Sequence, residues 1–295
     1  MIFKADSHAK INLFLYVTGK REDGYHTLYS LMTRVDLCDS LSFEFGLEQV
    51  SISCSHPDVP SDNTNIAARA ACLFFEEFYQ KKGGKKAGVD ITLEKVIPVG
   101  AGLGGGSSNA AVVLKVLNKK YHYPFSRKEL MDMGFFLGAD VPFFIHGGPA
   151  LARGVGERLE TSLPLQPYHV LLFYPGIQAL TGKVYKNMDF SLTKRGKSNI
   201  NNPLKRGRSG SVVDIKSFLH NDLETAALTQ YPDIKSAKKE LLQFQPEGVL
   251  MSGSGSTFFA LFTRYKRAKQ AYNALYAKWK GSGKKVFLTS FVQKM

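Results

Sequence analysis

Five glycines lie among the seven residues from 100 to 106, directly before a stretch with the apolar spacing of a helix. Backbone with so few side chains can bring several N–H groups to one anion, and the N-terminus of the following helix adds a partial positive charge. The segment therefore predicts a phosphate-binding loop. Its residues are Pro98, Val99, Gly100, Ala101, Gly102, Leu103, Gly104, Gly105, Gly106, Ser107 and Ser108.

Two common phosphate-binding motifs do not describe this loop. Three of its glycines have the spacing of a dinucleotide-binding fingerprint, but about twenty residues later, where an acidic residue should bind a ribose, residues 119–123 are basic and aromatic. A Walker loop needs a lysine before its hydroxyl residue, and here the glycines lead straight into Ser107 and Ser108. One of these hydroxyls could cap the helix, and the other could reach a phosphate or its metal ion. The alternative is a glycine-rich turn that binds nothing.

Composition predicts a globular protein that is not exported. With 295 residues, 44% apolar and 22% charged, the chain is long enough for one large or two ordinary domains. No apolar stretch approaches the length of a membrane span, so we expect a cytoplasmic protein without a membrane partner. Cys38, Cys54 and Cys72 are an odd number without metal-site spacing, which favours small core residues in a reducing compartment over disulfides or a zinc site.

The net charge of +14 could indicate nucleic acid or small anionic substrates. The densest basic stretch, Lys194 to Arg208, is interleaved with glycine, serine and asparagine, as in a solvated loop. A second cluster, residues 81–86, follows a predicted helix, where cations suit the helix dipole. Neither stretch has the stacking aromatic residues that single-strand binders use, so we expect no nucleic-acid partner.

The chain alternates between helical and strand patterns without a repeat. Apolar spacing predicts helices over 63–82, 107–120 and 268–279, and a capping box at Ser126 opens another that ends near Leu137. Predicted strands cover 89–94, 169–174, 248–251, 258–263 and 286–292. The Gly-Gly-Pro break at 147–149 divides the chain into lobes 1–149 and 150–295, and an active site would be expected between two lobes.

Four segments in order carry a family resemblance. They are residues 9–13 (Ala-Lys-Ile-Asn-Leu), residues 23–26 (Asp-Gly-Tyr-His), residues 138–144 (Gly-Ala-Asp-Val-Pro-Phe-Phe) and residues 251–257 (Met-Ser-Gly-Ser-Gly-Ser-Thr). Together with the glycine loop, and supported by residues 152–157 and 221–224, this pattern resembles the GHMP kinases over most of the chain. The triple glycine, the Asp-Gly-Tyr-His motif at 23–26 and the Gly-Ala-Asp-Val-Pro-Phe-Phe motif at 138–144 are similar to the branch that phosphorylates a cytidine-diphosphate-linked polyol, not a simple alcohol such as mevalonate, homoserine or galactose.

The resemblance implies a fold and a reaction. The fold would be α+β with two lobes: an N-terminal lobe like ribosomal protein S5 domain 2 and a C-terminal ferredoxin-like lobe, with the nucleotide between them. The reaction would transfer a phosphoryl group from ATP to the 2-hydroxyl of a methylerythritol carried on cytidine diphosphate, in the non-mevalonate route to isoprenoid precursors. Mg²⁺ would be required, the partners would be these small molecules, and the protein would be a monomer or homodimer.

The resemblance also assigns catalytic and metal-binding residues. Phosphoryl transfer needs positioned phosphates and a group that takes the hydroxyl proton. Asp140 would accept that proton, and Lys10 would keep the carboxylate ionised and lower the cost of forming an alkoxide. Ser107 and Asp140 are the candidate Mg²⁺ ligands.

Substrate-binding residues follow from the same resemblance. Tyr25 would stack on the cytosine with Tyr185 on the opposite face, His26 would read the edge of the base, and Asn12 would contact the substrate beside Lys10. The adenine pocket would contain Asn65, Ile66 and Lys95. Two alternatives remain open: a binding protein that kept the fold but lost catalysis, and a sibling kinase that acts on a simple alcohol.

Overall fold

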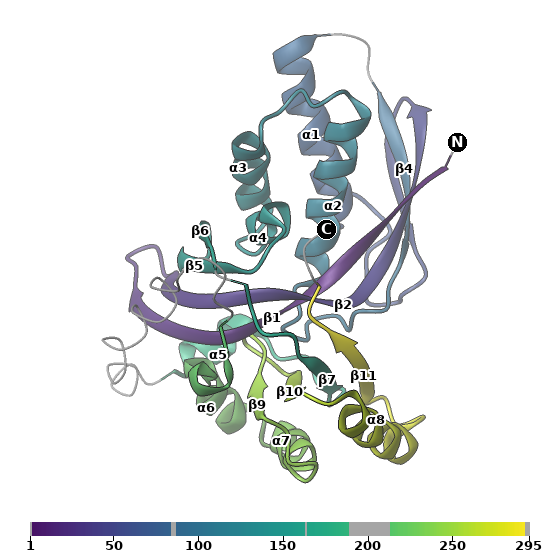
Figure 1. Ribbon diagram of the computed structural model, residues 1–295. Coiled ribbons are helices and arrows are strands. Elements are labelled where there is room, and N and C mark those ends of the chain that lie inside the picture. The colour runs from purple at the N-terminus through teal and green to yellow at the C-terminus, as the bar shows by residue number, and fades with distance from the viewer. Residues whose placement is uncertain (1, 84–86, 163, 189–212, 293–295) are drawn as a thin grey trace. The chain divides into compact units, whose positions relative to one another are not determined.

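The computed structural model describes residues 2–83, 87–162, 164–188 and 213–292 (Figure 1). Contacts between residues divide the chain into two compact units. Unit 1 contains residues 1–9, 37–99 and 104–147, and unit 2 contains residues 10–36, 100–103 and 148–295. One boundary falls between Gly147 and Gly148, and the others fall within two long strands and the glycine loop. The division into lobes 1–149 and 150–295 stays a prediction.

Two long strands, β1 (Ile2–Lys20) and β2 (His26–Leu47), contribute residues to both units. In unit 1 the second half of β2 pairs antiparallel with β4 (Gly88–Glu94), and β4 pairs parallel with β3 (Val50–Cys54). Neither β1 nor β2 was predicted. Residues 9–15 of β1 are buried without interruption, so the alternation that marks a half-buried strand is absent there.

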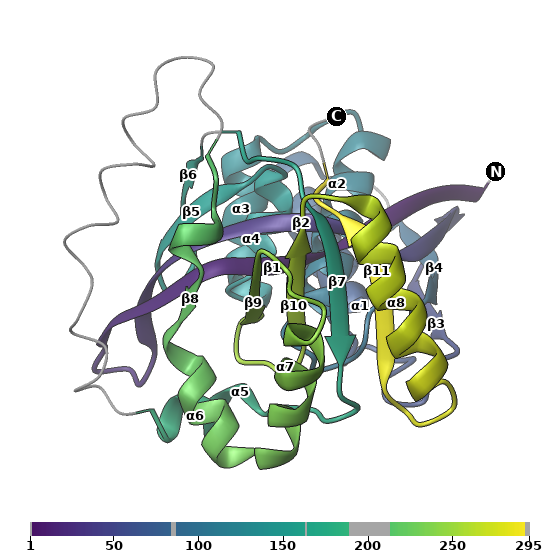
Figure 2. The ribbon, with the colours of Figure 1, turned by 60° about the horizontal axis from the view of Figure 1, so that its bottom comes forward.

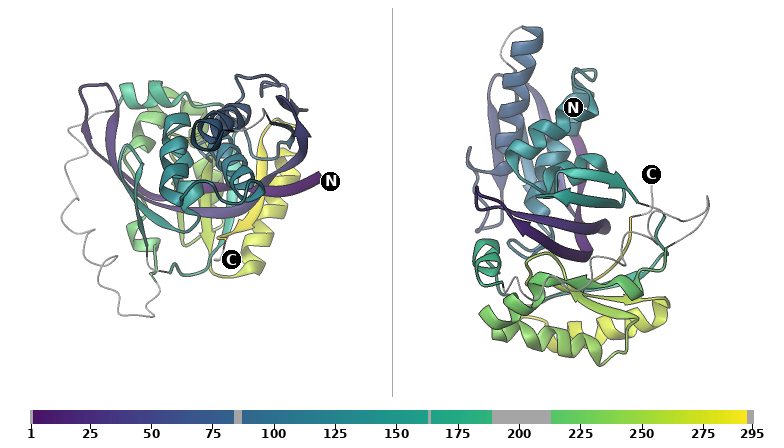
Figure 3. Two further views of the ribbon diagram at one scale, coloured as in Figure 1. Left: turned by 90° about the horizontal axis from the view of Figure 1, so that it is seen from above. Right: turned by 90° about the vertical axis from the view of Figure 1, so that its left-hand side faces the viewer.

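Four helices complete unit 1: α1 (Ile66–Lys82), α2 (Gly105–Lys120), α3 (Arg127–Leu137) and α4 (Val141–His146). Helices α1 and α2 pack side by side, and Figure 3 shows them as the long blue and teal coils. Their contact is apolar because the periodic residues found in the sequence, among them Phe74 and Leu114, are fully buried. The predicted capping box at Ser126 is confirmed, with its hydroxyl bonded to the Glu129 amide.

Unit 2 contains short strands that extend β1 and β2. Strand β5 (Ala150–Gly154) pairs antiparallel with the first half of β2 and with β6 (Arg158–Thr161). Strand β8 (His220–Asn221) pairs parallel with β1 at Phe14 and Leu15.

A second, fully antiparallel sheet in unit 2 has the order β11-β7-β10-β9 (Figure 2). Its strands are β7 (His169–Tyr174), β9 (Gly248–Met251), β10 (Phe258–Phe262) and β11 (Lys285–Ser290), which confirms four predicted strands. Helices α5 (Thr181–Lys186), α6 (Asp222–Gln230) and α7 (Lys235–Leu242) lie between β7 and β9 in the chain, and α8 (Tyr265–Trp279) lies between β10 and β11. This order and pairing is the ferredoxin-like arrangement expected for the C-terminal lobe.

The cysteines were expected in the core without disulfides; none of the three forms a disulfide, but Cys72 is exposed and Cys38 and Cys54 are only half-buried. That prediction is wrong for Cys72 because the buried face of α1 is made by other positions, including Ala71 and Phe74. The basic stretch Lys194 to Arg208 lies outside the described residues.

None of the helices in the part of the chain that the structure describes has the length and apolar character needed to cross a bilayer.

Candidate active site

The glycine loop has the backbone conformation that its sequence predicts. Gly100, Gly102 and Gly104 have φ angles of +64°, +78° and +69°, in the region that favours glycine. Gly104 is the N-cap of α2 and has no side chain to cap the helix. The first-turn N–H groups of α2 therefore have neither an intrahelical acceptor nor a capping side chain at the N-cap, which suits an anion at this helix start.

The two serines at this helix start differ. Ser108 is 2% exposed, and its hydroxyl accepts a 2.8 Å hydrogen bond from Ser7 Oγ. Ser107 is half-buried, and a Cβ placed on Gly138 would lie 3.9 Å from Ser107 Oγ. The Ser107 hydroxyl thus faces the segment that leads to Asp140, whereas the Ser108 hydroxyl belongs to the interior of unit 1.

A buried polar network supports the start of the loop in unit 1. The Asp39 carboxylate is fully buried and accepts hydrogen bonds from the backbone amides of Val96 (2.8 Å) and Ile97 (2.9 Å). The same carboxylate forms a 2.5 Å ion pair with Lys95 Nζ and accepts a 3.0 Å bond from Asn109 Nδ2 on α2. This network fixes the residues before the loop relative to the helix after it.

Asp39 and Asn109 were not predicted from the sequence, although the sequence around Asp39 contains a signal for it. Val35, Leu37, Leu41 and Phe43 are all buried, so alternate positions of β2 face inward. Asp39 lies in the same register, and a carboxylate at an inward position must find buried partners. Nothing in the sequence around Asn109 indicates that it would supply one.

Asp140 lies at the N-cap position of α4 and is half-buried. Its side chain makes no hydrogen bond that caps this helix. Its assignment as the base stays a prediction.

The three residues assigned to an adenine pocket have different surroundings. Asn65 caps α1 by accepting a bond from the Ala67 amide, and it donates one to the Pro60 carbonyl. The Lys95 ammonium is held by Asp39. Ile66 lies beside the loop, since its Cγ2 would be 3.5 Å from a Cβ on Gly106. The side chains of Asn65 and Lys95 therefore have structural roles, and their contact with adenine stays a prediction.

In unit 2, Lys10 and Asn12 form the first part of a fixed chain of hydrogen bonds. Lys10 is 4% exposed, and its Nζ donates to Asn12 Oδ1 at 2.7 Å. Asn12 Nδ2 donates to Ser30 Oγ at 2.8 Å, and that hydroxyl donates to the Phe14 carbonyl at 2.6 Å. Because both the oxygen and the nitrogen of the Asn12 amide are bonded, the orientation of the amide is fixed. The amide oxygen in turn fixes the position of the Lys10 ammonium.

The second glycine-rich segment, residues 252–257, packs against the first part of the glycine loop within unit 2. Ser252 Oγ donates to the Gly102 carbonyl at 3.0 Å, and the Thr257 amide donates to the Ala101 carbonyl at 3.3 Å. A Cβ on Gly102 would lie 2.2 Å from the Ser252 carbonyl oxygen, so this approach of backbone to backbone requires glycine.

Two of the predicted substrate-binding residues, His26 and Tyr185, meet in unit 2. The rings of His26 and Tyr185 are stacked, with centroids 4.8 Å apart and planes 21° apart. Tyr25, next to His26, is 62% exposed. Burial, with a smaller effect of the nearby Lys20 charge, lowers the pKa of His26, so its ring is neutral at pH 7 and has one donor and one acceptor nitrogen. In the expected arrangement the cytosine base lies between the rings of Tyr25 and Tyr185. In the structure the ring of His26 stacks directly on that of Tyr185.

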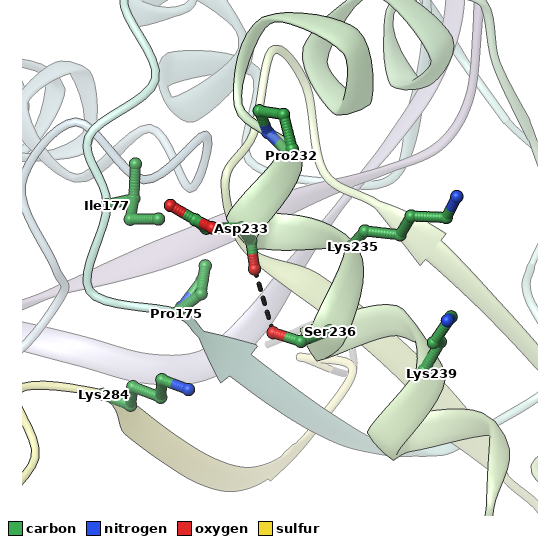
Figure 4. A pocket seen from close by; sticks show the side chains of 8 residues that line it. All are labelled: Pro175, Ile177, Pro232, Asp233, Lys235, Ser236, Lys239 and Lys284. Atoms are coloured by element: carbon green, nitrogen blue, oxygen red, sulfur yellow. Dashed lines mark hydrogen bonds between the residues drawn. The ribbon is translucent and has the colours of Figure 1, made fainter.

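A separate cavity of about 530 Å³ lies in unit 2 and contains none of the predicted site residues (Figure 4). Figure 4 shows a lining with apolar and charged side chains from the end of β7, the start of α7 and the turn before β11. The lining residues are Pro175, Ile177, Pro232, Asp233, Lys235, Ser236, Lys239 and Lys284.

The fit of the residues to Mg²⁺ can be judged from donor chemistry. The described residues contain no group of three or more histidine, cysteine or acidic side chains that could hold a metal ion by themselves. Mg²⁺ in phosphoryl-transfer sites is typically bound by one or two protein oxygens together with substrate phosphates. A Ser107 hydroxyl that faces the segment of Asp140 fits that requirement.

Known proteins resemble the chain over nearly its whole length. The family descriptions "GHMP kinases N terminal domain" and "GHMP kinases C terminal" match residues 65–148 and 204–281. A protein of Syntrophotalea carbinolica named 4-diphosphocytidyl-2-C-methyl-D-erythritol kinase is 43% identical over 89% of this chain and 90% of its own. One of the same name from Clostridium kluyveri is 38% identical over 99% of this chain and 100% of its own.

Solved structures agree with these relatives. The chain is similar to a crystal structure of 4-(cytidine 5'-diphospho)-2C-methyl-D-erythritol kinase, with a TM-score of 0.77 and 34% identity over 99% of this chain and 100% of that one. A homoserine kinase from Cytophaga hutchinsonii, 18% identical with a TM-score of 0.73 over 99% of this chain and 94% of that one, shares the fold. The two matched domains, the relatives and the two-lobe α+β fold show that this chain belongs to the GHMP kinase family.

Proposed function

We propose that this GHMP kinase phosphorylates the 2-hydroxyl of 4-diphosphocytidyl-2-C-methyl-D-erythritol with ATP, in the methylerythritol phosphate pathway to isoprenoid precursors. Relatives that carry this substrate in their names are 38 to 43% identical to most of the chain. The single structural observation that carries the proposal is the stacked pair of His26 and Tyr185, which brings together two residues far apart in sequence that were predicted to bind cytosine.

The proposed chemistry is direct transfer. The substrate hydroxyl oxygen forms a bond to the γ-phosphorus of ATP, the bond to the leaving ADP oxygen breaks, and Asp140 accepts the hydroxyl proton. Lys10 carries a positive charge that stabilises the developing alkoxide, and Asn12 fixes the direction of its ammonium.

In this proposal the phosphates lie against the N-terminus of α2. The amides of the first turn and the positive end of the helix dipole favour the anion, and the Gly104 conformation leaves the helix start without a side-chain cap. Ser107 and Asp140 would hold Mg²⁺, which neutralises phosphate charge when bound. Ser108 is excluded from this set because its hydroxyl is bonded to Ser7 in the interior.

Base recognition would require His26 to leave or share the face of Tyr185. Tyr25 is exposed and can close on the other side of the ligand, and the neutral imidazole of His26 can pair with the donor and acceptor groups at the edge of cytosine. The protein would be cytoplasmic and would act as a monomer or homodimer on these two small molecules.

Substrate competition tests this function. ATP consumption should be fast with the cytidyl substrate and at background level with mevalonate, homoserine and galactose. Activity with one of the simple alcohols and none with the cytidyl substrate would favour the sibling kinase. Nucleotide binding by calorimetry without turnover on any of them would favour a binding protein that has lost catalysis.

A further inference from the structure

The motif Asn221-Asp222-Leu223-Glu224 supports the family resemblance but has no part in the proposed chemistry. In the structure its first residue, Asn221, forms hydrogen bonds with three backbone groups. Asn221 Nδ2 donates 2.8 Å hydrogen bonds to the carbonyls of both Met251 and Gly253, while Asn221 Oδ1 accepts a 2.9 Å bond from the Leu223 amide and caps α6. Asn221 is 6% exposed, so these bonds do not compete with solvent.

The other polar residues of the motif attach it to neighbouring elements. Asp222 Oδ2 accepts a 2.7 Å bond from the Val17 amide of β1, the strand that also carries Lys10. Glu224 accepts a 3.0 Å bond from the Met251 amide and pairs with Lys238 of α7. The motif therefore ties the Lys10 strand to the loop that begins at Met251.

Gly253 is the point where that loop meets Lys10. A Cβ on Gly253 would lie 3.4 Å from both Lys10 Nζ and Asn12 Oδ1, and 3.3 Å from the Gly102 carbonyl oxygen. The residue has a φ of +57°, a conformation that glycine adopts without strain. The Gly253 carbonyl is thus held by Asn221, while its α-carbon lies against the bonded pair of Lys10 and Asn12.

We propose that Asn221 is a positioning residue of the kinase: by holding the Gly253 carbonyl, it keeps the 252–257 segment packed on Lys10, Asn12 and Gly102. This inference rests on the proposed role of Lys10. Asn221 touches no reacting group and acts through Gly253. A displacement of reacting groups by about 1 Å can cost on the order of 100-fold in rate, so loss of this restraint should reduce kcat.

Two substitutions separate the effect of the two hydrogen bonds from Asn221 Nδ2, which we call the Asn221 clamp, from the effect of the helix cap made by Asn221 Oδ1. Asn221→Ser keeps a good N-cap oxygen but loses both bonds from Nδ2. Asn221→Asp keeps the cap oxygen and the shape, but it replaces the donor with a carboxylate oxygen that faces two carbonyl oxygens. Ser126→Ala is the matched control, because it removes an N-cap from α3 in unit 1 and leaves all residues of the proposed site in place.

At pH 8 we expect kcat to fall about tenfold in Asn221→Ser and about 100-fold in Asn221→Asp, whereas Ser126→Ala lowers only the thermal midpoint. Between pH 8 and pH 6 the activity of Asn221→Asp relative to Asn221→Ser should rise. A protonated carboxyl has an O–H that can donate to one of the two carbonyls, so it partly restores the clamp. A role in helix stability alone would not produce this pH-dependent recovery.

The proposal is overturned if folded Asn221→Ser has wild-type kcat, if the loss of activity only follows the loss of folded protein, or if the activity ratio of the two variants does not change with pH. Lys10→Ala is measured in parallel. An inactive Lys10→Ala with fully active Asn221 variants removes only the positioning role. A fully active Lys10→Ala would contradict the proposed role of Lys10. The positioning role of Asn221, which depends on that role, would then also be refuted.

Discussion

Two buried lysines beside the glycine loop, one in each unit, are held in different ways. In unit 1, Lys95 forms an ion pair with Asp39, and the same carboxylate binds the backbone that leads into the loop. In unit 2, Lys10 donates to the neutral amide of Asn12, whose other end is fixed by Ser30. In the first arrangement the charge of Lys95 stabilises the fold through its ion pair with Asp39. In the second arrangement the bond to Asn12 fixes the position of the Lys10 ammonium. A lysine near the glycine loop therefore need not be a ligand of a phosphate.

Removal of each charge separately tests whether the two lysines have different roles. Lys10→Ala, or Asp140→Asn, should lower kcat by roughly 10² to 10⁴ with a small change in ATP affinity, because in the proposed reaction each removes a group that acts on the developing alkoxide. Steady-state kinetics with calorimetry of ATP binding measure both quantities.

The matched change is Lys95→Met, which leaves the Asp39 carboxylate buried without its ion-pair partner. It should lower the free energy of unfolding by about 3 to 5 kcal/mol, while kcat per folded molecule stays near wild type at low temperature. If Lys95→Met folds normally and loses turnover, the roles assigned to the two lysines are reversed.

The next largest effect, a loss of nucleotide binding, should come from a substitution at Gly104, the N-cap of α2. Gly104→Val puts a branched side chain at a φ of +69°, which such residues do not adopt without strain, and adds bulk at the start of α2. Nucleotide binding measured by calorimetry should be lost while circular dichroism retains the native helix signal. Normal ATP affinity in this variant would mean that the phosphates bind elsewhere.

A smaller effect should distinguish the two serines at the helix start. Ser108→Ala removes the acceptor of the buried Ser7 O–H, although Ser7 Oγ still accepts a bond from Asn109 Nδ2, and it should cost about 1 to 3 kcal/mol of stability with little change in kinetics. Ser107→Ala should leave the thermal midpoint unchanged and raise the Mg²⁺ concentration needed for half-maximal rate. The opposite pattern would exchange the roles of the two hydroxyls.

The local parts of this architecture could be predicted from sequence, and the supporting networks could not. The glycine loop and the Ser126 capping box are encoded by residues a few positions apart, and the structure has both. The clamp at Asn221 depends on Gly253, 32 residues away, and the pair of Lys95 with Asp39 spans 56 residues. Such contacts depend on the register of strands, which residue types alone do not specify.

At the substrate-binding residues, the Gly-Tyr-His motif is visible as three adjacent positions, but the roles of Tyr25, His26 and Tyr185 at cytosine follow only from the family resemblance.

Tyr25→Ala should weaken binding of the cytidyl substrate by about 1 to 3 kcal/mol, the range measured for base stacking on aromatic residues. ATP affinity should not change. Equal weakening for cytidyl substrate and ATP in calorimetric titrations would contradict a role confined to cytosine.

The smallest expected effect is a pH dependence that originates at His26. Its pKa is lowered in the folded protein, mainly by burial, so the unfolded chain binds the proton more readily than the folded one. Stability contributed by the neutral ring is fully present above the unfolded pKa of about 6.5 and decreases as the pH falls below it. Wild type should therefore lose more thermal stability than His26→Gln between pH 7.5 and pH 5.5, and cytidyl binding should weaken over the same interval. Parallel stability curves for the two proteins would show that the His26 ring is not held in its neutral form against Tyr185.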